Sequence, residues 1–176
     1  LHVLMDQRVI TSPEGDSMLI PVSENLSSSA VALVEPWACV EDAYACKERL
    51  CIKADGHTLI VADKTIEEGI LCDFFSKYGK PSQITWISEF SIPAEFDCII
   101  HNVTSISDVT DNSCDDLLFF GSEAKSIEEL FNKLAPHGLF HIALCNENLV
   151  RDINTPIGRI HYGGIRIIGT TGDNPG

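Results

Sequence analysis

The sequence lacks several patterns that would assign a function directly. No G-x-G-x-x-G phosphate loop follows its first buried apolar run, and neither the G-x-S-x-G pattern of serine hydrolases nor the H-E-x-x-H pattern of zinc peptidases occurs. The six histidines share no spacing that is typical of metal ligands. No secretory signal pattern and no run of 18 apolar residues is present, so the sequence predicts neither secretion by that route nor a transmembrane helix.

Positive charge is also scarce. The chain has 12 Lys and Arg residues against 26 Asp and Glu residues, which gives a formal net charge of −14. A chain this acidic repels phosphate backbones and anionic lipids, so nucleic acids and membrane surfaces are poor partners. The acidic residues are scattered along the sequence, so no acidic tail is predicted.

Seven cysteines are present, but no two of them have C-x-x-C spacing. The odd count and the missing spacing argue against a disulfide framework and against a zinc knuckle. Most of them lie in apolar runs, so we predict buried free thiols in the reducing cytoplasm. They are Cys39, Cys46, Cys51, Cys72, Cys98, Cys114 and Cys145.

The 176 residues, of which 44% are hydrophobic, are enough for one domain with a real core and too few for two full ones. The chain begins with Leu1, and we interpret it as a fragment of a longer protein. From residue 56 onward, apolar β-branched runs alternate with amphipathic segments, which predicts βαβ units with right-handed crossovers. We therefore predict an α/β fold, with a parallel sheet of five or six strands and flanking helices. The predicted strands cover residues 58–62, 83–87, 96–100, 117–120, 139–144 and 165–168.

The segment before residue 56 follows a different pattern. A Pro-Glu-Gly-Asp turn precedes a short predicted strand at residues 18–20. Ser27–Ser29 offer N-caps for a helix over residues 30–33. Glu35-Pro36 suits the first turn of a second helix, which is expected to run to about Leu50.

Two helices are predicted between the strands. Apolar residues recur at helical spacing over residues 65–78, and Gly79 is expected to end that helix. Ser126 is expected to cap a later helix, with Glu129 at the capping-box position. The link from Glu89 to Phe96, where the third predicted strand begins, is very short, so a full crossover helix does not fit there.

Ligands of parallel α/β sheets bind at the carboxyl ends of the strands, near the point where the strand order reverses. We therefore expect the binding residues in the segments that directly follow the predicted strands. The expected cofactor-binding residues are Asp63, Lys64, Thr65, Glu89, Gly121, Ser122, Gly169 and Thr170.

Three stretches, in this order, resemble one family. Residues 19–26 and 32–40, which contain Val-Glu-Pro-Trp-Ala-Cys-Val, resemble the passage that leads from the catalytic domain into the Rossmann domain of zinc-type medium-chain alcohol and polyol dehydrogenases. Residues 134–139 are similar to that family's L-x-P-G-G-x-L turn. Residues 159–162 and 168–174 are similar to a stretch of its sorbose-phosphate-reductase-like branch.

The resemblance implies NAD(H)-dependent hydride transfer at an alcohol carbon, with a catalytic zinc that polarises the substrate oxygen. It also implies that residues 1–34 are the tail of a GroES-like catalytic domain and residues 35–176 a Rossmann-like cofactor-binding domain. Glu35 matches a family glutamate that lies near the zinc in polyol dehydrogenases. The other zinc ligands belong to the missing catalytic domain, so zinc is expected only in the full-length parent, and the fragment is expected to be inactive. Alternatively, Glu35 only starts a helix.

The phosphate loop departs from the family. Residues 63–69 carry Asp63, Glu67 and Glu68 in the place of a glycine-rich loop, and carboxylates repel a pyrophosphate. The segment is either an ordinary strand-to-helix turn, with Asp63 or Thr65 as N-cap, or a non-standard phosphate site. We therefore expect NAD binding to be weak or lost.

Glu89 follows the second predicted strand, where an acidic side chain binds ribose hydroxyls and disfavours a 2′-phosphate. This position predicts NAD rather than NADP, although an acidic residue after a strand is also common without any such role.

Two alternative functions remain open at this point. One is a non-enzymatic Rossmann domain that serves dimerisation or scaffolding. The other is a methyltransferase-like domain that binds S-adenosylmethionine, which requires a glycine-rich first loop and a reversed final strand.

For the dehydrogenase domain, residues 165–168 form a short β-prone strand between glycines, and we expect a homodimer through this strand.

Overall fold

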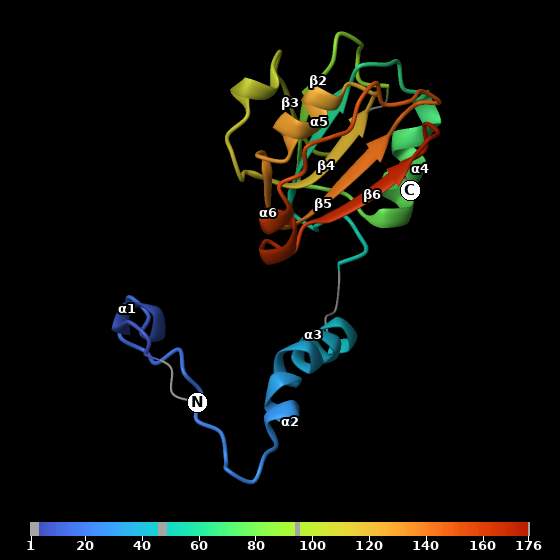
Figure 1. Cartoon of the computed structure of the whole chain (residues 1–176). Coiled ribbons are helices and arrows are strands. Elements are labelled where there is room, and N and C mark those ends of the chain that lie inside the picture. Colours follow the sequence, from blue (N-terminus) through green and yellow to red (C-terminus); the bar gives the residue numbers. More distant parts are fainter. Residues whose placement is uncertain (1–3, 46–48, 94–95, 176) are drawn as a thin grey trace. The chain divides into compact units, whose positions relative to one another are not determined.

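The computed structural model describes residues 4–45, 49–93 and 96–175. The chain forms two compact units, residues 1–48 and 49–176 (Figure 1). The first unit contains α1 (Gln7–Ile10), α2 (Ser28–Ala32) and α3 (Val34–Ala45).

The two helices predicted in the first unit are confirmed. The hydroxyl of Ser27 accepts a hydrogen bond from the N–H of Ala30 at 3.1 Å and caps α2. The described part of α3 ends at Ala45; residues 46–48 lie outside the described residues, and Leu50 is not helical. The strand predicted at residues 18–20 is wrong, because the described chain offers these exposed residues no partner strand beyond a single bridge at Ser17.

The second unit is built on a six-stranded sheet in which all neighbouring strands are parallel, which confirms the predicted fold class. The strand order is β3-β2-β1-β4-β5-β6. This is the order of doubly wound dinucleotide-binding folds, and it reverses between β1 and β4. The strands are β1 (His57–Ala62), β2 (Gln83–Ile87), β3 (Ile99–Asn102), β4 (Cys114–Phe120), β5 (Leu134–Ala143) and β6 (Arg166–Thr170).

Helices cover both faces of this sheet (Figure 1). On one face, Leu71, Phe74 and Phe75 of α4 (Glu68–Tyr78) pack against alternate residues of the central strands. On the other face, α5 (Ala124–Leu130) and α6 (Ile157–Tyr162) cover the opposite set of side chains. Full burial of one such side chain contributes about 1.5–3 kcal/mol, so this two-sided core is the main source of stability.

The helix boundaries correct three predictions. The helix α4 begins at Glu68 rather than near Thr65, with Glu67 as its N-cap, although Gly79, at φ 97°, ends it as predicted. The capping box at Ser126 is wrong, because the carboxylate of Glu123 accepts the Ser126 N–H and starts α5 earlier. The helix α6 was not predicted.

The observed strand boundaries agree best with the predicted ones in the centre of the sheet. The strands β1 and β2 match their predictions, whereas β3 begins at Ile99 instead of residue 96. Phe96 instead packs edge-to-face on Phe75 as part of the core. No helix occurs among the described residues between β2 and β3, as the short link predicted. The predicted Pro-His-Gly turn at residues 136–138 lies within β5, as an irregularity in its pairing with β4.

The prediction of buried cysteines is wrong for most of the described ones. Only Cys114 is buried among the described cysteines, although all six of these are free thiols; Cys46 lies outside the described residues. Apolar sequence neighbours did not guarantee burial, because Cys39 and Cys72 occupy the outer faces of helices. The exposed cysteines are Cys39, Cys51 and Cys72, and the partly buried ones are Cys98 and Cys145.

The amino ends of the strands are closed by a network of charged groups, which we call the amino rim (residues 49–57 and 115–116). Asp116 is completely buried, and its carboxylate accepts hydrogen bonds from the Arg49 guanidinium at 2.6 Å and from the Lys53 N–H at 2.8 Å. The Arg49 guanidinium also donates to three backbone carbonyls, those of Cys51, Asp115 and His137. This network fastens the segment before β1 to β4.

Candidate functional site

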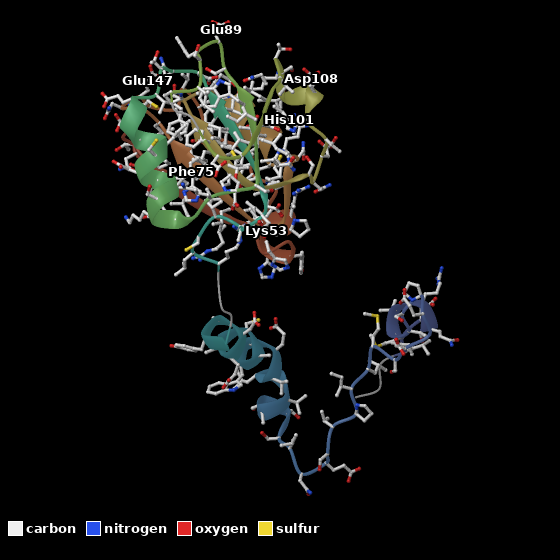
Figure 2. The ribbon with its side chains drawn as sticks, turned by 180° about the vertical axis from the view of Figure 1, so that it is seen from behind. Lys53, Phe75, Glu89, His101, Asp108 and Glu147 are labelled. Carbon is white, nitrogen blue, oxygen red and sulfur yellow. The ribbon has the colours of Figure 1, made fainter. Side chains whose placement is uncertain are left out.

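The candidate site lies at the opposite ends of the strands, which we call the carboxyl rim (residues 63–67, 88–90, 121–124 and 145–147). Figure 2 shows Glu89 and Glu147 at this end of the sheet and Lys53 at the other end. Three clefts of about 600, 500 and 320 Å³ open along the carboxyl rim. The structure therefore brings the predicted residues after β1, β2 and β4 to one rim.

Asp63 and Gly121 lie side by side where β1 and β4 end. The Asp63 N–H donates to the Phe120 carbonyl at 2.9 Å, and the Gly121 N–H donates to the Ala143 carbonyl at 2.9 Å. A Cβ atom on Gly121 would lie 2.6 Å from Asp63 Oδ2, so only glycine fits beside this carboxylate. The Asp63 side chain thus occupies the space next to the Cα atom of Gly121.

Lys64 and Ser122 meet at Glu147, which follows β5. The Lys64 ammonium lies 2.6 Å from Glu147 Oε1, and the Ser122 hydroxyl donates to Glu147 Oε2 at 2.5 Å. The Lys64 ammonium and the Ser122 hydroxyl lower the pKa of Glu147, and the Glu147 carboxylate raises the pKa of Lys64. This contact joins the ends of β1, β4 and β5.

The other carboxylates of the rim differ in their surroundings. Burial, together with the charge of Glu123, raises the pKa of Asp63. The backbone N–H of Ser126 lowers the pKa of Glu123, because it stabilises the carboxylate form at the start of α5. Protonation of Asp63 is therefore shifted to higher pH than in a free aspartate, and protonation of Glu123 to lower pH than in a free glutamate.

Glu89 is exposed beside the 600 Å³ cleft, which it lines together with the end of β1. The segment after β2 is fixed by its own hydrogen bonds: the Ser88 hydroxyl donates to the Ala62 carbonyl at 2.7 Å and accepts the Phe90 N–H at 3.1 Å. The Trp86 indole N–H donates to the Phe90 carbonyl at 3.0 Å. The backbone that carries Glu89 is thus fixed beside the cleft between β1 and β2.

Thr65 and Glu67 line the smallest cleft, with Asn146 and Asp173 from the far side. Neither Asp63 nor Thr65 caps α4; Glu67 does so through its backbone alone. The side chain of Glu68 lies outside the described residues. Because two carboxylates and one lysine line this cleft, its net charge opposes an anionic ligand.

Gly169 and Thr170 lie at the end of β6, and neither lines one of the three clefts described above for the carboxyl rim. The Thr170 carbonyl accepts the Leu144 N–H at 3.0 Å, and its hydroxyl accepts the Gly172 N–H at 3.2 Å. The structure thus uses Thr170 to join β6 to the chain that leaves β5.

Glu35 lies on α3, in the first unit. Its carboxylate accepts a hydrogen bond from the Cys39 thiol, one helical turn later, at 3.4 Å, and this raises the pKa of Cys39. In the part of the chain that the structure describes, no group of three or more Cys, His, Asp or Glu side chains is placed to hold a metal ion. One glutamate and one thiol provide too few ligands for zinc.

Sequence reasoning did not identify Glu147 as a site residue, although it follows a predicted strand as closely as the chosen residues do. It also missed Arg151, which lines the 500 Å³ cleft and binds Glu128 at 2.6 Å. The position of Glu147 after a strand was a usable signal. Its pairing with Lys64 could not be found in this way, because the two residues are distant in sequence.

No protein-family model and no curated protein matches this sequence. Solved structures match with low identity. A zinc-binding dehydrogenase from Sinorhizobium meliloti bound to NADP aligns at a TM-score of 0.51 and 12% identity, over 75% of this chain and 41% of that one. Benzyl alcohol dehydrogenase from Acinetobacter calcoaceticus aligns at 0.50 and 13%, over 89% of this chain and 45% of that one. The chain thus spans less than half the length of these structures, and the likeness shows a shared Rossmann-like fold.

No helix in the described part of the chain combines the length and the hydrophobicity that crossing a bilayer requires.

Proposed function

We propose that this chain is the cofactor-binding part of an NAD-dependent, zinc-type alcohol or polyol dehydrogenase. The observation that carries the proposal is the position of Glu89, at the end of β2 and beside the cleft between β1 and β2, in a sheet of order 3-2-1-4-5-6. In folds of this order an acidic residue there binds the ribose of a dinucleotide. The solved dehydrogenases that share the fold, one of which is bound to NADP, support the coarser interpretation of a dinucleotide-binding dehydrogenase domain.

Glu89 selects the cofactor by charge. Its carboxylate accepts hydrogen bonds from the two hydroxyls of an adenosine ribose and repels the 2′-phosphate of NADP. The Ser88 hydroxyl fixes the local backbone, so the residue that carries the carboxylate is in place beside the cleft before the ligand arrives. We therefore propose a preference for NAD(H) over NADP(H).

The rest of the carboxyl rim fits the cofactor only in part. Lys64 is a suitable partner for a diphosphate, but it is paired with Glu147. In a glycine-rich loop, a phosphate group approaches the backbone closely because the glycines have no side chain. Here the Asp63 side chain occupies the space beside Gly121. We propose that NAD(H) binds weakly for these two reasons.

The described residues do not fit zinc, so no step of the reaction is assigned to a metal on this chain. We propose that the parent protein supplies the zinc ligands from its catalytic domain, that Glu35 lies near the metal there, and that the isolated chain is inactive. We further propose the division at residues 34 and 35, a sugar-phosphate or other polyol substrate, and a cytoplasmic location. The six free thiols support the last point.

We also propose a homodimer through β6. This strand is at one side of the sheet, and its Ile167 and Ile168 are 41% and 39% exposed. Pairing with a second copy would extend the sheet beyond β6 and bury both isoleucines. Light scattering is expected to give twice the chain mass for the natural sequence and a single chain mass for Ile167→Pro. A monomer at high concentration, or a proline variant that stays dimeric, argues against this interface.

A second candidate is a domain that keeps the fold without the cofactor, and the Lys64–Glu147 contact favours it. The methyltransferase alternative loses support, because the last described strand, β6, is parallel to β5 rather than reversed.

Calorimetric titration with NADH, NADPH and S-adenosylmethionine tests the proposal. We expect weak, saturable binding of NADH, weaker binding of NADPH, and none of S-adenosylmethionine. Glu89→Gln is expected to weaken NADH binding and to reduce the discrimination against NADPH. Glu129→Gln, which removes an exposed carboxylate on α5, is the matched control and is expected to change neither. Tight NADPH binding, or no effect of Glu89→Gln on NADH, would overturn the assignment.

A further inference from the structure

Lys64 and Arg151 are the cations that line the described clefts of the carboxyl rim. Arg151 is locked in place, because its two terminal nitrogens bind both Glu128 oxygens at 2.6 and 2.8 Å and Glu128 also accepts the Asn154 N–H. The Lys64 ammonium, by contrast, contacts a carboxylate on a side chain that is 41% exposed. Exposed pairs of this kind are weak and can exchange partners. Lys64 is therefore the cation that a ligand can recruit.

The contact lies where the strand order reverses. Lys64 follows β1 and Ser122 follows β4, the two strands on either side of the reversal, and Glu147 reaches both from the end of β5. Ligands of doubly wound sheets lie outside the carboxyl ends of these same strands. One oxygen of Glu147 binds Lys64 and the other accepts from Ser122, so the carboxylate bridges the two sides.

We propose that Glu147 competes with the diphosphate of the dinucleotide for Lys64, and that this competition limits how tightly the carboxyl rim binds the cofactor. The inference rests on the proposed function, because it concerns the same site. A diphosphate offers oxygens that an ammonium group binds as readily as a carboxylate. Binding therefore requires Lys64 to leave Glu147, and the carboxylate that stays behind repels the incoming phosphates.

The neighbouring groups keep Glu147 charged at neutral pH, so its competition with the diphosphate for Lys64 does not depend on pH in that range. The Lys64 ammonium and the Ser122 hydroxyl lower the pKa of Glu147, so its carboxylate remains ionised throughout the neutral range. Asp63 lines the same cleft and adds a second carboxylate on the side of β1. Removal of the Glu147 charge alone should release Lys64 and leave the remainder of the rim unchanged.

Glu147→Gln is the direct test, because the amide keeps the size of the side chain and its oxygen can still accept from the Ser122 hydroxyl. We expect this variant to bind NADH at least about threefold more tightly than the natural sequence, within the range that exposed ion pairs contribute. Lys64→Met in the Glu147→Gln background is expected to remove the gain. Glu67→Gln is the matched control: it removes one carboxylate from the same rim, and that side chain makes no capping hydrogen bond to α4.

Titrations with NADH and with inorganic pyrophosphate separate the possible outcomes. A gain for Glu147→Gln that depends on Lys64 and exceeds the gain for Glu67→Gln supports the competition. Equal gains for Glu147→Gln and Glu67→Gln, with NADH still bound and weakened by Glu89→Gln, overturn the competition and leave the proposed function intact. A Lys64-dependent gain for pyrophosphate without any NADH binding supports the competition and overturns the proposed function. If neither probe binds any variant, both are overturned.

Discussion

At the amino rim one carboxylate, that of Asp116, is buried and held by several contacts, whereas at the carboxyl rim the charged side chains are more exposed and loosely paired. Asp116 has no exposed surface and is bound by Arg49 and by the Lys53 N–H. Glu147 is 41% exposed and binds Lys64, which is 45% exposed. The same kind of ion pair thus stabilises the fold at one rim and leaves a cation available to a ligand at the other.

The difference follows from the solvent around each pair. A buried charge that loses its partner costs several kcal/mol, so the partners at the amino rim are in effect permanent. Water screens an exposed pair, which can therefore open at little cost. Stability and binding are separated in this sheet because its two ends place their charges in different dielectric surroundings.

The largest expected effect is at the amino rim. Arg49→Met leaves the Asp116 carboxylate buried without its cation, and we expect a loss of about 3 kcal/mol in the free energy of unfolding. Urea denaturation followed by circular dichroism measures the loss. Lys53→Met, which breaks the more exposed pair with Asp115, is the control and is expected to cost no more than about 1 kcal/mol. Equal losses for the two variants would remove the distinction between buried and exposed pairs.

A smaller effect, on the pH dependence of the free energy of unfolding, is expected from His141, a buried residue of β5. Its Nδ1 donates to the Pro175 carbonyl at 2.9 Å, its Nε2 has no hydrogen-bond partner among the described atoms, and its ring packs edge-to-face on Phe74. Burial lowers the pKa of His141 below 6.5, and the nearby charges of Asp116 and Arg49 act on it in opposite directions. The imidazole is therefore neutral in the folded state.

The sign of the pH dependence follows from this lowered pKa. Between the folded pKa and about 6.5 the unfolded chain binds a proton that the folded chain does not, so the contribution to stability is complete above about 6.5 and is lost as the pH falls. We expect the natural sequence to lose up to about 1.4 kcal/mol per pH unit in this window relative to His141→Gln. Urea denaturation at several pH values measures both profiles, and parallel profiles would show that His141 does not titrate.

The centre of the sheet could be predicted from the sequence, and the site only in outline. The runs that became β1 and β2 are mostly apolar or β-branched, and most of their residues are buried, so local pattern and burial agree there. The helix α6 was missed, because its six residues include Gly158 and carry no long apolar stripe. The carboxyl rim was located because strand ends are visible in a sequence.

Which groups meet at the carboxyl rim depends on contacts between distant residues, and no local pattern encodes them. Ser122 and Glu147 each follow a strand, but only the sheet order brings them together with Lys64. The partners of Asp116 were hidden for the same reason, since Arg49 lies 67 residues away in the sequence. Three-dimensional proximity, rather than residue type, decided these pairings.

The smallest expected effect concerns the pH dependence of cofactor binding at the carboxyl rim. Burial and the charge of Glu123 raise the pKa of Asp63, whereas the pKa values of Glu123 and Glu147 are lowered. As the pH falls, Asp63 therefore loses its charge at a higher pH than a free aspartate does, whereas Glu123 and Glu147 keep theirs to a lower pH than a free glutamate does. A bound diphosphate raises the pKa of Asp63 further, so binding and protonation favour each other.

We expect the affinity for oxidised NAD, which is stable in mild acid, to rise about twofold to threefold between pH 7 and pH 5. The rise reflects the removal of one repulsive charge beside the phosphates, and calorimetric titration at several pH values measures it. Asp63→Asn lacks this charge at every pH, so it should bind more tightly than the natural sequence at pH 7, and its affinity should change little with pH. If the natural sequence and Asp63→Asn show the same pH profile, protonation of Asp63 does not control binding, and the comparison between the rims then depends on the Lys64–Glu147 pair alone.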